Sequence, residues 1–252
     1  MDEGLLGVFD REWVRRAASH LDKRRRLYLG VFVIGFVAGY PAAELIIEWL
    51  LDSDGFIPTG VEVIILQPLE VIMLQLRIAA QIAFGLTIAT IILDLAGTGV
   101  RSFPESAARL SRSPDAKRVV SAMLAVVALG AMGLAYAHNV LIPFLLEYLA
   151  ADSAESGLQS TWQLQSWVGF VTGLYFSSVL GFQVPILAVL LIRSGIIERG
   201  AIVENRGLIW FAALFIGALI SPPDPISLFL VGGPMLVLLE VALIYERLTN
   251  VE

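Results

Sequence analysis

Polar side chains inside long apolar runs are the residues of this chain best placed to do chemistry. Gln183 and Glu240 each lie within such a run, and His138 and Asn139 stand together near the end of another. A charge at mid-membrane costs about 2.5 to 3.5 kcal/mol on insertion scales, so polar groups kept there are candidates for a function. Gln183 and Glu240 are therefore candidate intramembrane sites. His138 fits an interfacial hydrogen-bonding role better than a proton relay.

The histidine and cysteine content argues against metal and nucleophilic chemistry. The chain has two histidines and no cysteine, whereas a catalytic zinc takes three protein ligands in convergent geometry. No Ser, His and Asp spacing, Gly-rich phosphate loop or pair of catalytic carboxylates stands out. We therefore expect no enzyme activity and no metal or cofactor. The net charge of −6 also argues against a nucleic-acid partner.

The composition predicts that membrane helices position these polar residues. Of the 252 residues, 57% are hydrophobic and 16% are charged, and the mean hydropathy is +0.79. Several apolar runs approach the length of about 20 residues that crosses the hydrocarbon core as a helix. The prediction is an all-α polytopic membrane protein with a single domain over residues 1–252. The first 26 residues are too basic for a cleavable signal peptide.

Six apolar runs predict six transmembrane helices. The first run carries Pro41, Glu44 and Glu48, and the third is expected to end at Pro143. Before them, residues 10–26 place apolar residues at helical spacing among cations. This pattern indicates either a helix on the membrane surface or a basic flank that only fixes topology. The expected runs are 27–51, 69–95, 119–141, 168–192, 207–220 and 226–245.

The last two runs predict a short helical hairpin. Three prolines between residues 221 and 225, including Pro222 and Pro223, remove amide donors and prevent a continuous helix. The arm before this turn, residues 207–220, spans roughly 21 Å at about 1.5 Å per residue, less than the ~30 Å hydrocarbon core. This arm either thins the bilayer or ends inside it.

The distribution of cations predicts the orientation of the chain. All Lys and Arg residues except Arg77 fall in the N-terminal 26 residues, the loops 97–118 and 193–206, and the C-terminal tail. Because cytoplasmic loops carry the excess of cations, both termini and both loops are expected to be cytoplasmic, in a cell membrane. Arg77 on the far side either snorkels to the outer interface or pairs with one of three carboxylates, Glu44, Glu48 or Glu70.

The hairpin carries a specific combination of residues. Pro222-Pro223-Asp224 at the turn is followed by Pro234-Met235 and then by Glu240. This combination resembles the C-terminal signature of TatC, the core subunit of the twin-arginine protein translocase. Three further motifs are similar to those of the family, in the same order. They are Asp22-Lys-Arg24-Arg-Arg26-Leu27 against Glu-x-Arg-x-Arg-Leu, Pro68-Leu-Glu70 against Pro-x-Glu, and Gly181-Phe-Gln183-Val-Pro185 against Gly-x-x-Phe-Glu-x-Pro.

Three departures from the family pattern affect the implied site. Asp22 stands where the family usually has Glu, which keeps the charge but shortens its reach. Gln183 replaces a Glu, so a charged or proton-linked role at that position is lost. The conserved Glu of the first cytoplasmic loop has no clean counterpart, because Glu105 and Asp115 are both near and the loop differs in length.

The resemblance implies a Sec-independent translocase subunit that binds twin-arginine signal peptides and nucleates the complex exporting folded proteins with the proton gradient. The implied signal site combines Asp22 with Glu105 or Asp115, oriented by Arg24 and Arg26, because guanidinium groups are bound by carboxylates. The implied partners are these peptides, single-helix TatA- and TatB-type subunits docking near Gln183 and Glu240, the lipid bilayer and further copies of the chain. The implied structural residues are Pro68, Glu70, Pro222, Pro223, Asp224 and Pro234.

A small-solute secondary transporter is the alternative. Such proteins usually show internal repeats or paired broken helices. No convincing repeat relates residues 27–118 to residues 119–245, although prolines such as Pro185 and Pro234 interrupt two helices. A membrane-embedded enzyme would need a clustered acid-base or metal set, which this sequence does not display.

Overall fold

The computed structural model describes residues 22–53, 56–58, 61–98, 116–155, 161–193, 199–204, 206–207, 209–211 and 225–249. Several predictions lie outside these residues. They concern the surface helix before residue 22, the tight turn with Pro222, Pro223 and Asp224, the loop carboxylates Glu105 and Asp115, and most of the run 207–220.

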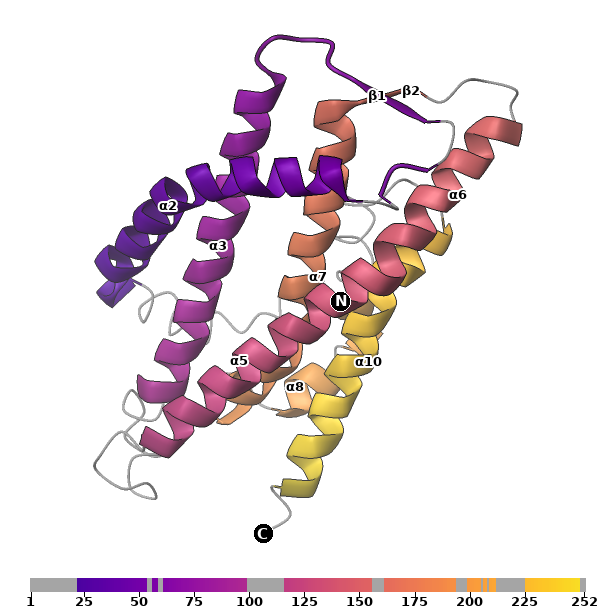
Figure 1. The fold of residues 1–252 in the computed structure, drawn as a ribbon. Helices are drawn as coiled ribbons and strands as arrows, with labels where there is room; N and C mark the ends of the chain where they lie inside the picture. Colours follow the sequence, from indigo (N-terminus) through magenta and orange to yellow (C-terminus); the bar gives the residue numbers. More distant parts are fainter. Residues whose placement is uncertain are drawn as a thin grey trace, which may run out of the picture.

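The first two predicted membrane helices are α2 (Arg25–Asp52) and α3 (Glu70–Thr98), which pack closely against each other. Small residues allow this approach. A Cβ added at Gly35 would lie 3.1 Å from the Cα of Ala83, and one at Gly39 would lie 3.2 Å from the Cα of Ala79. In Figure 1 α2 changes direction along its length, and Pro41 inside the helix accounts for the bend.

The third membrane helix is longer than predicted. It runs as α5 (Ala116–Tyr136), the π-helical turn η2 (Ala137–Leu141) and α6 (Ile142–Glu155), so the prediction that Pro143 ends it is wrong. Proline lacks an amide donor and clashes with the carbonyl of the preceding turn. The wider turn accommodates this, since the amide of Ile142 donates to Ala137 and the side-chain amide of Asn139 donates to the Ala135 carbonyl at 2.7 Å.

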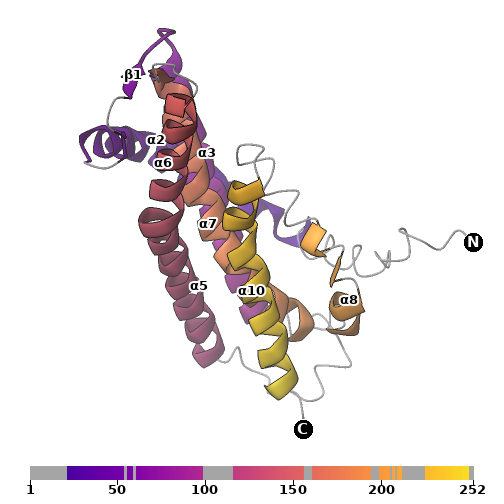
Figure 2. The same ribbon diagram turned by 90° about the vertical axis from the view of Figure 1, so that its right-hand side faces the viewer.

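Helix α7 (Leu164–Arg193) is the centre of the bundle. It contacts α3, α5 and α10, and in Figure 2 it lies between α5 and α10. Its contact with α5 includes a hydrogen bond of 2.9 Å from the Ser178 hydroxyl to the Gly133 carbonyl. Buried residues follow α7 over most of its length, among them Val168, Val171 and Leu174 in the main hydrophobic core. The helix begins four residues before the predicted run.

The C-terminal part contains α8 (Arg199–Glu204) and α10 (Pro225–Thr249), with Pro234 inside α10. Helix α10 packs on α7, where a Cβ at Gly181 would lie 2.6 Å from the Met235 side chain. Within the described residues, four helices are long and apolar enough to cross a membrane, and α10 contributes a shorter apolar stretch, Gly232–Ile244. The described chain is thus an all-α polytopic membrane protein.

Two short strands, which the sequence analysis did not predict, close one end of the bundle. β1 (Glu62–Ile64) pairs in parallel with β2 (Thr161–Gln163), with Glu62 opposite Thr161 and Ile64 opposite Gln163. We call this the strand end of the molecule, at the top of Figure 1. The opposite end, where Asp22–Arg26 meets the last turns of α3, is called the basic end.

Candidate functional site

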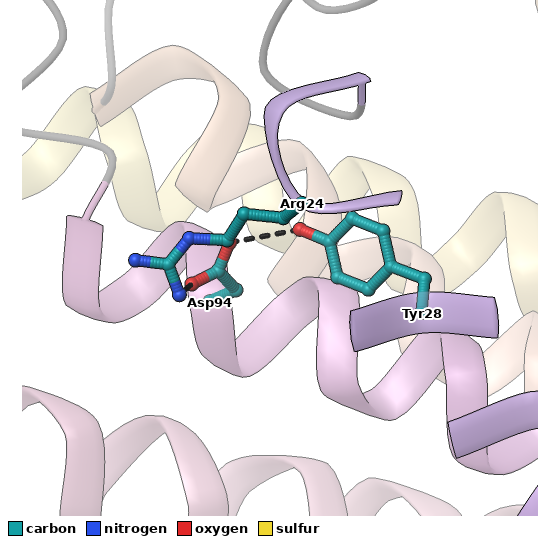
Figure 3. Close-up of polar contacts among 3 residues, drawn as sticks. All are labelled: Arg24, Tyr28 and Asp94. Carbon is teal, nitrogen blue, oxygen red and sulfur yellow. Dashed lines mark hydrogen bonds and ion pairs between the residues drawn. The ribbon is translucent and has the colours of Figure 1, made fainter. Parts of the chain in front are cut away.

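An ion pair joins the start of α2 to the last turns of α3 at the basic end. Nη1 of Arg24 lies 2.6 Å from Oδ1 of Asp94, and the Tyr28 hydroxyl donates to Oδ2 of Asp94 at 2.8 Å. Residues 24 and 28 are one helical turn apart, so both side chains reach the same carboxylate (Figure 3). The Asp94 side chain is 7% exposed and that of Arg24 is 44% exposed.

Asp22 presents its carboxylate to solvent beside this cluster. Its side chain is 74% exposed and lies 3.5 Å from Nη1 of Arg25, three residues along the chain. Exposed ion pairs of this kind contribute about 0 to 1 kcal/mol, because water competes for both charges. The carboxylate is therefore accessible to another cation. Arg26 is also exposed.

Sequence reasoning missed Asp94 and Tyr28. Asp94 is a carboxylate inside the predicted helix 69–95, and ionisable residues within membrane runs are candidates by default. This rule identified Glu240 and could have identified Asp94. Tyr28 carried no comparable signal, because a tyrosine near the start of a membrane helix is usual at an interface.

Glu70 connects three segments at the strand end. Its buried Oε1 accepts hydrogen bonds from the amides of Leu66 at 3.0 Å and Gln67 at 2.9 Å, and from Nε2 of Gln163 at 2.7 Å. Gln163 is the last residue of β2, and Pro68 lies in the turn between the two amides and Glu70. This carboxylate thus closes the turn before α3 and attaches it to β2.

Arg77 in α3 contacts α7 rather than a carboxylate. A Cβ at Gly169 would lie 2.5 Å from Nη1 of Arg77, so the guanidinium occupies the space that the glycine leaves. Among the described residues Arg77 forms no ion pair, and Glu44 and Glu48 are exposed elsewhere on α2. Of the two alternatives for Arg77, pairing with Glu44, Glu48 or Glu70 is therefore wrong, because α7 packs against this part of α3, while snorkelling to the outer interface stays a prediction.

A cavity of about 900 Å³ lies between α2, α3, α5, η2 and α7. Its walls are mostly apolar, with a few polar groups that include Gln183 and His138. Gln183 is 6% exposed and donates from Nε2 to the Val126 carbonyl at 3.2 Å, while its Oε1 is buried and has no hydrogen-bond partner in the described part of the chain. The Gln183 amide is thus a buried polar group in a mostly apolar wall, with one oxygen that no described residue binds.

His138 lies at the edge of this cavity, in an aromatic cluster. Its Nδ1 shares a hydrogen bond of 2.8 Å with the Tyr175 hydroxyl, as expected for a hydrogen-bonding role. Its ring stacks against Trp49 with a centroid distance of 6.1 Å and lies 5.5 Å from that of Phe56. The π-helical turn carries His138, so the same irregularity that accommodates Pro143 places this ring between α2 and α7.

Glu240 in α10 forms an ion pair with Arg206. Nη2 of Arg206 lies 2.8 Å from Oε2 of Glu240, and the second oxygen, Oε1, is buried with no hydrogen-bond partner among the described residues. The ion pair joins α10 to the segment that follows α8. Gln183 and Glu240 therefore have different neighbours, α5 and residue 206, although both belong to helices that pack together.

These features define a class of protein. The chain is a multi-pass α-helical membrane protein with an apolar cavity between its helices and a basic segment anchored at one end. The part that the structure describes holds no cluster of three His, Cys, Asp or Glu residues suited to a metal ion.

Comparisons with known proteins identify the family. The model of the family described as Sec-independent protein translocase protein (TatC) matches residues 19–234. Over 230 residues the chain is 26% identical to the Sec-independent protein translocase protein TatCy of Bacillus subtilis (strain 168), covering 91% of this chain and 86% of the relative. Over 228 residues it is also 26% identical to TatC of Synechocystis sp., covering 86% and 82%.

A solved structure shows the same fold. The crystal structure of the twin arginine translocase receptor TatC in DDM superposes with a TM-score of 0.70 at 21% identity, covering 91% of this chain and 98% of that one. The chain belongs to the TatC family. It is accordingly a subunit of the Sec-independent (Tat) protein translocase, a transport component and not an enzyme.

Proposed function

We propose that the basic end of this translocase subunit receives twin-arginine signal peptides from the cytoplasm, with Asp22 as a primary carboxylate. The observation that carries this proposal is the exposed Asp22 side chain beside an anchored arginine. An arginine of the signal stays charged and can bind a carboxylate through two parallel N–H donors. Asp22 is free to accept such a pair because its contact with Arg25 is long and solvated.

The surrounding cations contribute to selectivity. Lys23, Arg25 and Arg26 are exposed next to Asp22, so a lone cation meets repulsion as well as attraction there. A peptide with two adjacent guanidinium groups overcomes this repulsion when it engages two carboxylates together. We propose that Glu105 or Asp115 in the loop 97–118 supplies the second carboxylate, with Arg24 and Arg26 orienting the set.

The orientation of the bundle follows from charge. We propose six membrane helices with both termini cytoplasmic, the fifth being the short arm 207–220. The cation excess in residues 1–26 and in the loops 97–118 and 193–206 supports this topology. The strand end then faces the exterior. Arg77 is the one Lys or Arg that the sequence places on this side, as the low cation content of exterior segments predicts.

The cavity and α10 are proposed docking places for single-helix TatA- and TatB-type subunits in a complex with several copies of this chain. A helix with an apolar face would match the mostly apolar cavity wall, to which Gln183 contributes. Glu240 would act at a separate place, where its ion pair with Arg206 holds α10. Export of folded cargo by the assembled complex draws on the proton gradient in this proposal.

Peptide binding to the purified full-length chain tests the proposed function. A fluorescent signal peptide with the Arg-Arg pair is titrated against the protein in lipid nanodiscs, beside the same peptide with Lys-Lys. Lysine keeps the charge but cannot form the bidentate pair of hydrogen bonds that a guanidinium makes with a carboxylate. We expect the Arg-Arg peptide to bind at least tenfold more tightly. Equal affinity for both peptides would exclude a guanidinium-specific receptor at this end.

A further inference from the structure

We propose that Asp94 is a positioning residue for signal recognition, because it fixes the segment Asp22–Arg26 against the end of α3 through Arg24 and Tyr28. This inference rests on the proposed function and assigns a role to a residue outside the four motifs described above. Asp94 itself touches no peptide in this account, since its side chain is 7% exposed and already occupied.

The geometry of the Asp94 carboxylate supports this role, and we call its two contacts, with Arg24 and Tyr28, the clamp. One oxygen pairs with Arg24 at 2.6 Å and the other accepts from Tyr28 at 2.8 Å, so both contacts lead to the start of α2 (Figure 3). Arg24 precedes the first residue of α2, and Tyr28 lies one turn inside the helix. Two anchors one turn apart fix both the position and the rotation of this helix end relative to α3.

The clamp determines where Asp22 lies. Within the described residues, the Asp22 carboxylate forms one ion pair, the exposed pair with Arg25, and such a pair fixes a side chain only weakly. Arg24 is two residues further along the chain and is anchored to the partly buried end of α3. The position of Asp22 therefore depends on the Arg24 anchor rather than on its own contacts.

The clamp also changes the charge that a signal peptide meets. Three consecutive arginines, Arg24 to Arg26, would repel an incoming pair of guanidinium groups. Asp94 neutralises the arginine of this run that is nearest to Asp22 in the sequence, and it holds that side chain against α3. Asp22 then faces the peptide with less competition from its own chain, which favours binding of the peptide.

The test is a double-mutant cycle on peptide affinity with the full-length chain in nanodiscs. The variants are Asp94→Asn, Asp22→Asn and the double variant, titrated with the fluorescent Arg-Arg peptide. Because Asp94 acts through the segment that carries Asp22, we expect Asp94→Asn to weaken binding at least fivefold. The double variant should bind no more weakly than Asp22→Asn alone. Unchanged affinity in Asp94→Asn, or full additivity of the two changes, would overturn the proposal.

Two further variants separate positioning from folding. Tyr28→Phe removes a single hydrogen bond and should weaken binding about twofold, whereas Asp94→Glu keeps the charge and should restore most of the affinity. Circular dichroism and thermal unfolding report whether each variant is folded, and Glu62→Gln at the strand end serves as the control for a carboxylate change remote from the site. If Asp94→Glu binds as weakly as Asp94→Asn while both are folded, the positioning role is wrong.

The same titrations distinguish failure of this inference from failure of the proposed function. If the unchanged chain prefers the Arg-Arg peptide over the Lys-Lys peptide but Asp94→Asn leaves the affinity unchanged, only the positioning role of Asp94 is wrong. If the unchanged chain shows no preference between the two peptides, the proposed function is wrong, and so is the positioning role that rests on it.

Discussion

At the residue scale, carboxylates in this protein differ sharply in how they are used. Glu70 is buried and accepts three hydrogen bonds, Asp94 is occupied by Arg24 and Tyr28, and Asp22 is exposed with one long contact. A buried carboxylate oxygen that accepts several hydrogen bonds stabilises its surroundings, whereas an exposed and loosely paired carboxylate can exchange partners. Asp22 is therefore the one among these three that suits ligand binding.

Replacing Asp22 by asparagine should weaken binding of the Arg-Arg peptide about tenfold, equivalent to roughly 1.4 kcal/mol, because a charge-assisted pair becomes a neutral hydrogen bond. The measurement is the dissociation constant in nanodiscs at fixed ionic strength. Glu62→Gln provides the matched control, since Glu62 is equally a surface carboxylate but lies at the strand end. An affinity loss of the same size in both variants would mean that net charge, not the site, is responsible.

The residue scale is also where sequence reasoning was least complete. The motif around Asp22, Arg24 and Arg26 could be recognised from sequence, but the partner of Arg24 could not. Asp94 is 70 residues from Arg24 along the chain, and only the packing of α2 on α3 brings the two together. The three-residue strands escaped notice for a similar reason, since their pairing depends on segments about 100 residues apart.

At the element scale, some helix boundaries could be predicted from the sequence better than others. The boundaries of α2 and α3 agree with the predicted runs within three residues, because long apolar stretches leave little freedom in where a membrane helix begins and ends. The third helix was predicted less well. A proline usually stops a helix, and the π-helical turn that lets this one continue has no clear sequence signal.

Gly39→Leu should destabilise the contact between α2 and α3 by about 1 to 3 kcal/mol, the usual cost of overpacking. A Cβ at Gly39 would lie 3.2 Å from the Ala79 Cα, and backbone atoms cannot move aside as a flexible side chain can. Thermal unfolding in detergent measures the effect. Gly30→Leu is the matched control on the same helix, because a Cβ there meets nothing within 4 Å. Equal melting temperatures for the two variants would contradict the packing account.

Replacing Glu240 by alanine should disturb α10 more than signal recognition. Arg206 would lose its partner at 2.8 Å, and the attachment of α10 to the residues after α8 would weaken. We expect reduced co-purification of single-helix subunits, measured from detergent extracts, with the Arg-Arg peptide affinity within twofold of the unchanged chain. A selective loss of peptide affinity with normal co-purification would show that this assignment is wrong.

At the scale of the whole molecule, two ends with different chemistry follow from one bundle. The strand end is closed by paired strands and by Glu70, while the basic end gathers cations around Asp22 and Asp94. Helix α7 connects these regions at the centre of the bundle, and the cavity opens between its neighbours. Signal binding at one end and docking of a partner in the membrane can therefore involve different surfaces of the same subunit.

The predicted orientation can be checked with single cysteines, since the natural chain has none. A membrane-impermeant maleimide applied to intact cells should label Glu62→Cys at the strand end. It should label Lys23→Cys only after the membrane is permeabilised, because the basic end is proposed to face the cytoplasm. Labelling of Lys23→Cys in intact cells would reverse the orientation and remove the basic end as a receptor for cytoplasmic signals.

A site-specific photocrosslink from the Arg-Arg region of a signal peptide to this chain in native membranes tests directly whether the basic end receives the signal. We expect crosslinks within residues 22–26 and at the end of α3 near Asp94, and we expect them to be lost when the peptide carries Lys-Lys. Crosslinks concentrated on β1 and β2 at the strand end, or an unchanged pattern with Lys-Lys, would contradict this expectation.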